Sequence, residues 1–367
     1  MIIDIIAGAR PNFMKIAPII DAIKQKKNDG YDINYRLIHT GQHYDKKMSG
    51  DFFDQLGIPA PDANLDAGGG SQAEQTAAIM VRFEQELLLH RPNLVIVVGD
   101  VTSTMACAIT AQKLHVKVAH VEAGIRSDDW TMPEEINRLV TDSITNYFFT
   151  TSEVANNNLR NSGIGDERIF FVGNTMIDTL LKNKANFICP SIWQEANLSD
   201  RNYFVLTLHR PANVDQEHQL KELMAKIIEN SRGLPVIFPV HPRTAKNLQG
   251  LGIEAPNLFF IEPLSYLEFN YLVQRAKMVV TDSGGITEET TVMGIPCITL
   301  RNNTERPETV TIGTNELIGT DPRAIKPAFE KLFNGNWKNG NIPPLWDGNT
   351  AVRIVDHLCE LNAAGNL

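Results

Sequence analysis

Ionisable side chains stand repeatedly at the ends of the apolar segments of this sequence. The carboxylates that could move protons are Asp100, Glu122, Glu134 and Glu135. Two imidazoles, those of His209 and His241, could donate hydrogen bonds to phosphate or shuttle protons. The cations that could neutralise a multiply charged anion are Arg10, Lys15, Arg210, Arg243 and Arg306. This combination favours acid–base chemistry on a phosphorylated or nucleotide-linked substrate.

The segment MVVTDSGGITEE, residues 278–289, is a candidate phosphate site. A β-branched run precedes a sharp turn, and a helical segment follows the turn. The paired glycines Gly284 and Gly285 let a ligand approach the backbone N–H groups at the positive end of that helix. The hydroxyl of Ser283 could cap the helix or donate to phosphate. An ordinary helix cap in a strand–helix turn explains the segment equally well on pattern alone.

The other candidate residues also have purely structural explanations. Asp100 could cap the helix that follows it. Glu122 could form a structural ion pair, and acidic residues such as Glu134 are favoured at a helix start by the helix dipole. Lys15 could be a solvated surface residue, and His209 could be a hydrogen-bonded core histidine. Residue type and position alone therefore do not separate a functional role from a structural role at these positions.

Strand-like runs alternate with helical segments along the chain, which is typical of α/β proteins. The expected strands are 2–7, 35–40, 94–98, 116–121, 147–151 and 169–172, and then 203–209, 236–241, 258–261, 278–281, 297–300 and 316–318. Two doubly wound, Rossmann-like domains facing a cleft explain this pattern better than one large sheet. We expect domains at 1–172 and 173–350, with a C-terminal helix at about 351–367 that could pack back on the first. Ligands in such sheets bind at the carboxyl ends of the strands, where the ionisable residues lie.

Composition excludes several classes of protein. The net charge of −9 disfavours nucleic-acid and anionic-membrane partners, and no apolar run is long enough to span a membrane. The amino-terminal segment lacks the features of a secretory signal, and the four well-separated cysteines look like reduced core residues of a cytoplasmic protein. The first turn reads GARPNF instead of GxGxxG, and there is no P-loop and no zinc-type spacing. We therefore expect neither a cofactor nor a metal.

Taken together, the motifs resemble those of the non-hydrolysing UDP-N-acetylglucosamine 2-epimerase family. They extend over nearly the whole chain: GARPNFMKIAPI (8–19), TGQH (40–43), GDVTST (99–104), HVEAGIRS (120–127), MPEEINR (132–138), VGNTMIDTL (172–180), LHRPAN (208–213), PVHPRT (239–244), LSYLEF (264–269), TDSGGITEE (281–289) and TERPETVTIGTNELIGTD (304–321). Each motif alone is weak, but their order and spacing are specific.

The resemblance implies a fold, an activity and an assembly. The fold is the two-Rossmann-domain architecture found in one large class of glycosyltransferases (GT-B), with the UDP-binding site in the C-terminal domain. The activity is interconversion of UDP-GlcNAc and UDP-ManNAc without a nicotinamide cofactor, by elimination of UDP to 2-acetamidoglucal and re-addition. Members are usually homodimers. Closure of the domains around the substrate is a further expectation, because the intermediate must be held away from water.

The resemblance also implies roles for individual residues. The catalytic carboxylates would be Asp100, Glu122 and Glu134, and His209 would stabilise the departing UDP. The diphosphate, ribose and uracil would be bound by the following residues, with Lys15 and Arg306 completing the pocket: Arg10, Ser283, Gly284, Gly285, Glu289 and Phe269.

Departures from the family pattern bear on regulation and substrate. Many bacterial members use an allosteric UDP-GlcNAc site, for which Gln42, His43, Gln72 and His241 are candidates here. Ser71 and Pro211 replace residues that are often arginine in the family, and Ala212 replaces one that is often glutamate. Leu264 stands near the expected uracil site where other members have glutamine, and the loop IRSDDWTMPEE differs from its commoner form. These differences leave room for a related UDP-2,3-diacetamido sugar or its uronic acid.

Three alternative functions share parts of this pattern. A hydrolysing epimerase would use the same fold and carboxylates but release UDP and free ManNAc. A glycosyltransferase would need an acceptor site and would not need the carboxylates together with His209. A non-catalytic nucleotide-sugar sensor would be expected to have lost at least one of these residues, and none is lost.

Overall fold

Short β-branched runs form the two parallel sheets of this chain. The computed structural model describes residues 1–41, 55–240, 248 and 252–367. The described part divides into two compact units, unit 1 (Met1–Lys182 and Pro344–Leu367) and unit 2 (Asn183–Pro343). Each unit contains one sheet with helices on both faces. Because runs such as LVIVV are buried on both faces, they are uniformly apolar instead of alternating.

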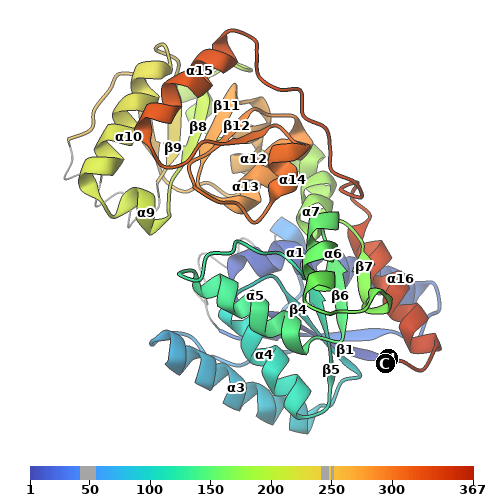
Figure 1. The fold of residues 1–367 in the computed structure, drawn as a ribbon. Helices are drawn as coiled ribbons and strands as arrows, with labels where there is room; N and C mark the ends of the chain where they lie inside the picture. Colours follow the sequence, from blue (N-terminus) through green and yellow to red (C-terminus); the bar gives the residue numbers. More distant parts are fainter. Residues whose placement is uncertain (42–54, 241–247, 249–251) are drawn as a thin grey trace. The chain divides into compact units, whose positions relative to one another are not determined.

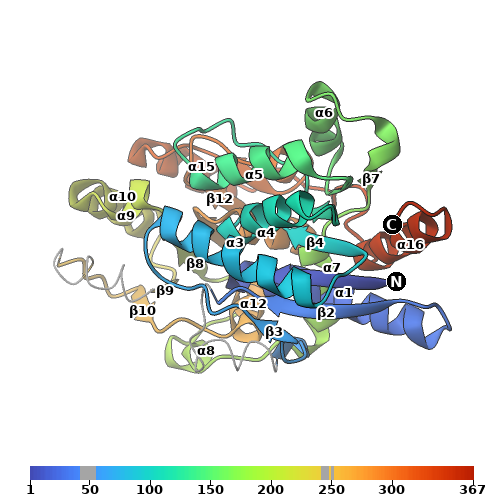
Figure 2. The ribbon, with the colours of Figure 1, turned by 90° about the horizontal axis from the view of Figure 1, so that it is seen from below.

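The sheet of unit 1 has seven strands in the order β3-β2-β1-β4-β5-β6-β7. The strands are β1 (Ile2–Ala7), β2 (Asn34–His39), β3 (Ala63–Asn64), β4 (Leu94–Val98), β5 (Lys117–Val121), β6 (Tyr147–Thr150) and β7 (Ile169–Phe171). The helices of this unit are α1 (Arg10–Asn28), α3 (Gln72–Leu89), α4 (Thr102–Lys113), α5 (Pro133–Ile144), α6 (Glu153–Asn161), α7 (Thr175–Asn183) and α16 (Thr350–Ala363). Helices α3, α4 and α5 cover one face of the sheet, and α1 and α16 pack together on the other (Figures 1 and 2).

The sheet of unit 2 has six strands in the order β10-β9-β8-β11-β12-β13. They are β8 (Phe204–Thr207), β9 (Val236–Pro239), β10 (Leu258–Ile261), β11 (Met278–Thr281), β12 (Cys297–Thr299) and β13 (Asn315–Leu317). The helices are α8 (Ile192–Glu195), α9 (Pro211–Val214), α10 (Glu217–Asn230), α12 (Tyr266–Arg275), α13 (Gly284–Met293), α14 (Pro307–Thr311) and α15 (Ile325–Phe333). Alternate residues of β8 enter two separate cores: Phe204 and Leu206 pack with α10 and α15, and Val205 packs with α12.

The carboxyl-terminal helix α16 belongs to unit 1. Asp178 of α7 accepts hydrogen bonds from the first backbone N–H groups of α16, at 3.1 Å from Thr350 and 2.7 Å from Ala351. Trp346 is buried just before this helix, and its indole N–H donates to the carbonyl of Thr151 at 2.9 Å. Gly173 has φ +103°, and a Cβ there would lie 2.1 Å from the Leu345 carbonyl. These contacts attach the end of the chain to its first sheet.

The expected α/β class with two doubly wound units is confirmed, and every expected strand is present within two residues of its predicted limits. The sequence pattern after β4 predicts a helix over 105–114, whereas the structure begins this helix at Thr102. The prediction missed β3 and α3, although Ser71 and Glu74 form a capping box at the start of α3. Cys189 is exposed, so the expectation that all the cysteines are core residues is wrong there. In the part of the chain that is described, no helix is long and apolar enough to cross a membrane.

Candidate active site

Glu122 lies just after β5 and is held in a buried ion pair. Its backbone has φ +68°, a left-handed conformation that is unusual for a residue with a side chain and is often found at functional sites. The Glu122 carboxylate lies 2.5 Å from the ammonium of Lys15 in α1, and both side chains are at least nine-tenths buried. A Cβ at Gly99 would lie 3.0 Å from the Lys15 nitrogen, so glycine leaves room for this pair. Lys15 is therefore a buried partner and not a solvated surface residue.

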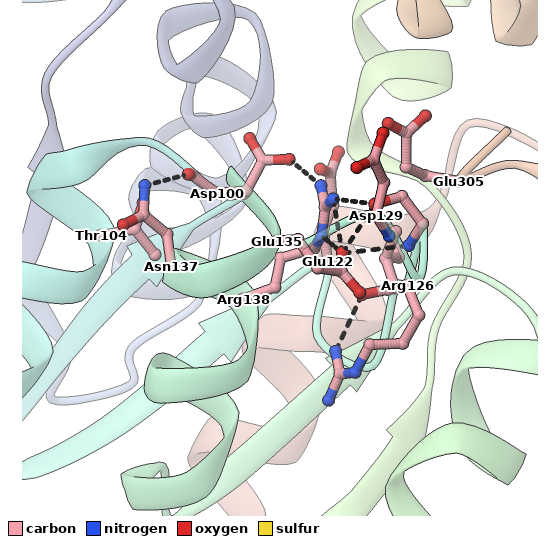
Figure 3. Close-up of polar contacts among 12 residues, drawn as sticks. Asp100, Thr104, Glu122, Arg126, Asp129, Glu135, Asn137, Arg138 and Glu305 are labelled. Atoms are coloured by element: carbon pink, nitrogen blue, oxygen red, sulfur yellow. Dashed lines mark hydrogen bonds and ion pairs between the residues drawn. The ribbon is translucent and has the colours of Figure 1, made fainter. Parts of the chain in front are cut away.

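Asp100, after β4, belongs to a second group of charges. Its carboxylate pairs with Arg138 of α5, and its backbone carbonyl accepts a hydrogen bond from the Asn137 side chain at 2.8 Å (Figure 3). Val101 occupies the N-cap position of α4, so Asp100 does not cap that helix. The Asp100 side chain keeps about one-third of its surface exposed, at 32%. It is thus a fixed carboxylate that is still accessible.

Glu135 connects this group to the loop after β5. Its carboxylate accepts hydrogen bonds from the Arg138 Nε at 2.8 Å and from the backbone N–H and hydroxyl of Ser127 at 3.0 Å. Burial opposes the charge of Glu135, but these hydrogen bonds and Arg138 outweigh it and lower the pKa of the carboxyl. Glu135 therefore positions Arg138 and the loop, whereas the neighbouring Glu134 is exposed in the first turn of α5.

A buried His–Asp pair supports the two strand ends that carry Asp100 and Glu122. The imidazole of His120 lies 2.7 Å from Asp142 and 2.8 Å from the Gly99 carbonyl. The Asp142 carboxylate also accepts from the backbone N–H of Gly124 at 3.1 Å and from Arg126 at 2.6 Å. Burial would raise the pKa of Asp142, but His120 and Arg126 outweigh it and lower that pKa. These contacts fix the backbone next to Asp100, at Gly99, and the backbone after Glu122, at Gly124.

In unit 2, His209 follows β8 and Asp282 follows the adjacent strand β11. The Nδ1 atom of His209 lies 2.7 Å from the Asp282 carboxylate. Asp282 is fully buried, whereas the His209 side chain is 57% exposed. His209 is therefore not a core histidine: one edge of its ring is anchored and the other faces outward.

The turn after Asp282 leads directly into α13. Gly284 and Gly285 are the first residues of this helix, and Ser283 is its N-cap residue. The expectation that the Ser283 side chain caps the helix is wrong, since that side chain makes no cap hydrogen bond. The Ser283 backbone N–H instead donates to the Thr281 hydroxyl at 3.0 Å. The first helical turn thus combines backbone N–H groups, which suit an anion, with a partly exposed hydroxyl.

Further along α13, Glu289 and Glu288 make different contacts. Glu289 is buried and accepts hydrogen bonds from Tyr266 at 2.9 Å and Asn270 at 3.5 Å, and its burial raises the pKa of the carboxyl to about 7. Glu288 pairs with Arg306. The Arg306 guanidinium is therefore held by an ion pair with α13.

The family model of UDP-N-acetylglucosamine 2-epimerase matches residues 24–359, which is most of the chain. The chain belongs to the UDP-N-acetylglucosamine 2-epimerase family. This confirms the family resemblance drawn from the motifs.

Relatives in this family match over nearly their full length. The UDP-N-acetylglucosamine 2-epimerase of Methanocaldococcus jannaschii is 41% identical over 97% of this chain and 98% of its own. The UDP-2,3-diacetamido-2,3-dideoxy-D-glucuronate 2-epimerase of Pseudomonas aeruginosa is 40% identical over 97% of this chain and 99% of its own. The crystal structure of the M. jannaschii enzyme in complex with UDP-GlcNAc and UDP superposes with a TM-score of 0.86, covering 98% of this chain and 100% of that one.

Not every residue expected in the epimerase site can be placed. Gln42, His43 and His241 lie outside the described residues, and Arg10 is described only as the first residue of α1. Gln72 is exposed, and its side-chain oxygen accepts from the Thr102 hydroxyl at 3.3 Å. Phe269 is half-buried against the core beneath α12. Among the residues that the structure describes, no group of three or more His, Cys, Asp or Glu side chains could hold a metal ion.

Sequence reasoning did not single out Arg138 or Asp282. Arg138 lies three residues after Glu135 in α5, a spacing that places both side chains on one face of the helix and could have indicated their ion pair. Asp282 was recognised only as part of a turn. Its contact with His209 joins residues 73 positions apart, and no local pattern indicates such a pair.

Proposed function

We propose that this protein interconverts UDP-N-acetylglucosamine and UDP-N-acetylmannosamine at C2 without hydrolysing them. The observation that carries the proposal is the match over 98% of the chain to an epimerase structure that contains UDP-GlcNAc and UDP. The fixed carboxylates after β4 and β5, and the His209 and α13 turn of unit 2, support it. They provide proton-transfer groups and an anion-binding helix start, as the reaction needs.

The proposed reaction is an elimination followed by re-addition. The C2–H bond breaks, its proton passes to an enzyme carboxylate, and its electron pair forms the C1–C2 double bond. The C1–O bond breaks at the same time, and its electron pair leaves with UDP. UDP then adds back to C1 of 2-acetamidoglucal while a proton is delivered to the opposite face of C2. Removing the C2 proton without the simultaneous loss of UDP would be far costlier, because that proton is not acidic.

The proposed roles follow the chemistry of each group. Asp100, Glu122 and Glu134 are the candidate proton carriers. Glu122 is held by Lys15 and Asp100 by Arg138, so both have a fixed orientation. His209 would stabilise the negative charge that develops on the departing UDP.

The remaining proposed residues bind the nucleotide. The diphosphate would contact Arg10 and the Ser283 hydroxyl and N–H groups at the start of α13, and Lys15 and Arg306 would complete the pocket. Glu289 would accept hydrogen bonds from the ribose hydroxyls, and Phe269 would lie beside the uracil. We propose Gln42, His43, Gln72 and His241 as candidates for a regulatory UDP-sugar site, and a homodimer as the assembly.

Proton NMR of the protein with UDP-GlcNAc in D₂O tests the proposal. We expect UDP-ManNAc to appear with one solvent deuteron at C2, because the proton removed exchanges with water before the return step. Accumulation of free ManNAc with an equal amount of UDP would replace the proposal by a hydrolysing epimerase. Absence of any reaction would contradict it.

A second candidate substrate is a UDP-2,3-diacetamido sugar or its uronic acid. The 40% identity to the P. aeruginosa epimerase of that class, over 97% of this chain, is the specific observation in its favour. Measuring kcat/KM for both substrates in the same assay separates the two. A higher value for the diacetamido sugar would identify it as the substrate and leave the proposed chemistry at C2 unchanged.

A further inference from the structure

The contact between His209 and Asp282 constrains the protons of the imidazole ring. The Nδ1 atom lies 2.7 Å from Asp282 Oδ1, within hydrogen-bond distance. An ionised carboxylate can only accept hydrogen bonds, so Nδ1 must carry the proton in this contact. The other ring nitrogen, Nε2, then remains for a substrate, and the exposure of the ring makes it accessible.

The second carboxylate oxygen of Asp282 is occupied by the turn after β8. Asp282 Oδ2 accepts from the backbone N–H of Arg210 at 2.9 Å, from Asn213 Nδ2 at 3.0 Å and from the backbone N–H of His209 at 3.1 Å. The backbone N–H of His209 is shared with Oδ1, from which it lies 3.2 Å. Oδ2 thus accepts from three donors, and Oδ1 is the oxygen that faces the imidazole.

Asp282 is ionised despite its burial. Burial would raise the pKa of this carboxyl, but the hydrogen bond and charge of His209, together with Asn213 and Arg210, outweigh it and lower that pKa. An uncompensated buried charge would be costly, so the four donors around it are necessary partners.

We infer that Asp282 is a positioning residue that keeps the proton of His209 on Nδ1 and presents Nε2 to the diphosphate. The inference rests on the proposed function. When Nε2 also carries a proton, the buried carboxylate balances the charge of the imidazolium, and Nε2–H donates a hydrogen bond to the oxygen of UDP that receives the C1–O electron pair. Asp282 itself does not touch the substrate.

The substitution Asp282→Asn separates this role from a merely structural one. The donors around Oδ2 select the amide oxygen of asparagine for that position, which preserves the hydrogen bonds of the turn. The NH₂ group of the asparagine must then face His209 Nδ1 and donate to it. Nδ1 can accept only when it carries no proton, so the proton of the neutral ring moves to Nε2. The doubly protonated imidazolium is disfavoured, because it would place an N–H on Nδ1 against the NH₂ group. We expect kcat to fall by about 100-fold or more, the size of a lost electrostatic contribution to the charge that develops on UDP, with a much smaller change in KM.

The direct readout is ¹⁵N NMR of the histidine ring nitrogens, assigned to His209 with the variant His209→Gln. We expect a protonated Nδ1 in the unaltered protein and a protonated Nε2 with unprotonated Nδ1 in Asp282→Asn. Thr207→Val is the matched control, because it removes a 2.6 Å hydrogen bond to Thr281 on the same two strands without touching the imidazole. The control should keep the ring-nitrogen pattern and keep turnover within about twofold.

Two results would overturn the inference. One is a neutral His209 that carries its proton on Nε2 in the unaltered protein. The other is Asp282→Asn with reversed ring protonation but normal turnover, which would leave Asp282 a structural residue only. If the unaltered protein does not act on either UDP-sugar, the proposed function fails, while the ring-nitrogen signals still decide whether Asp282 sets the tautomer of His209.

Discussion

At the scale of single residues, several buried charged side chains of this protein lie beside a group of opposite charge. The Lys15–Glu122 pair is the clearest case, because both groups are buried and only 2.5 Å apart. A buried ion pair adds little net stability over an apolar pair, but removing one partner is costly because the remaining charge has lost its compensation. The sequence distance of 107 residues means that this pair also ties α1 to the end of β5.

The first prediction concerns this pair. Lys15→Met should lower the free energy of unfolding by about 3–5 kcal/mol, because the Glu122 carboxylate stays buried without its cation. The double variant Lys15→Met, Glu122→Gln should recover a large part of that loss, since no charge then remains. Urea unfolding of the single and double variants measures both values. A loss below about 1 kcal/mol in Lys15→Met would show that Glu122 finds other compensation.

At the scale of elements, side chains from one helix complete the end of another. The N-cap residue of α16, Asn349, makes no side-chain cap hydrogen bond. Asp178 of α7 fills that function through its hydrogen bonds to Thr350 and Ala351. Burial raises the pKa of Asp178, and these N–H groups oppose that rise. The carboxylate also lies at the positive end of the α16 dipole, which favours its charge.

The second prediction is that Asp178→Ala loosens α16. Loss of the two N–H acceptors should reduce the free energy of unfolding by about 1–2 kcal/mol, the usual range for a helix cap. It should also speed proteolytic cleavage between Pro344 and Thr350. Asn349→Ala is the matched control, and it should change stability by less than about 0.5 kcal/mol because its side chain does not cap. Equal effects of the two substitutions would contradict the assigned role of Asp178.

At the scale of the whole molecule, the two units have separate cores, and each of them buries a carboxyl whose pKa is raised to about 7. Asp4 in β1 of unit 1 and Glu289 in α13 of unit 2 are both buried, and burial raises each pKa to about 7. For Asp4, the charge of Arg36 only partly offsets burial. A carboxyl with a raised pKa binds its proton more tightly in the folded state. Its protonated form therefore favours folding at low pH, and that contribution is lost as pH rises.

The third prediction follows from the sign of this linkage. Between the ordinary pKa of Asp4, 3.8, and its folded value of about 7, the folded state holds more protons, so stability falls as pH rises. Asp4→Asn should flatten this fall in unit 1 and make the protein more stable at pH 8, by an amount that increases by at most about 1.4 kcal/mol per pH unit across the window. Hydrogen exchange resolved along the chain should show the change in unit 1 alone.

The control for Asp4→Asn is Asp32→Asn, which removes an equal charge from a side chain that is 93% exposed. It should leave the pH dependence unchanged. An unaltered pH profile in Asp4→Asn, or an equal effect of both variants, would show that Asp4 is not the titrating group.

The sequence by itself determined the class of the fold and selected the candidate residues of the site. Runs such as Leu94–Val98 and Met278–Thr281 are buried strands because β-branched residues suit a sheet covered on both faces. Polar residues that follow such strands lie at the carboxyl edge of their own sheet. Asp100, Glu122 and His209 could therefore be selected as candidates without coordinates. The motifs in their order then specified the family.

The tertiary structure decided which of these residues act in pairs. Lys15 meets Glu122, and Asp282 holds His209, across 107 and 73 positions of sequence, because parallel strands bring distant strand ends together. The tertiary structure also distinguished Glu135, which is buried and paired with Arg138, from its exposed neighbour Glu134. Adjacent residues of identical type point in different directions on a helix, and only packing determines which one is desolvated. Protonation, and therefore chemistry, depends on that desolvation and on the partner, and neither is a local property of the sequence.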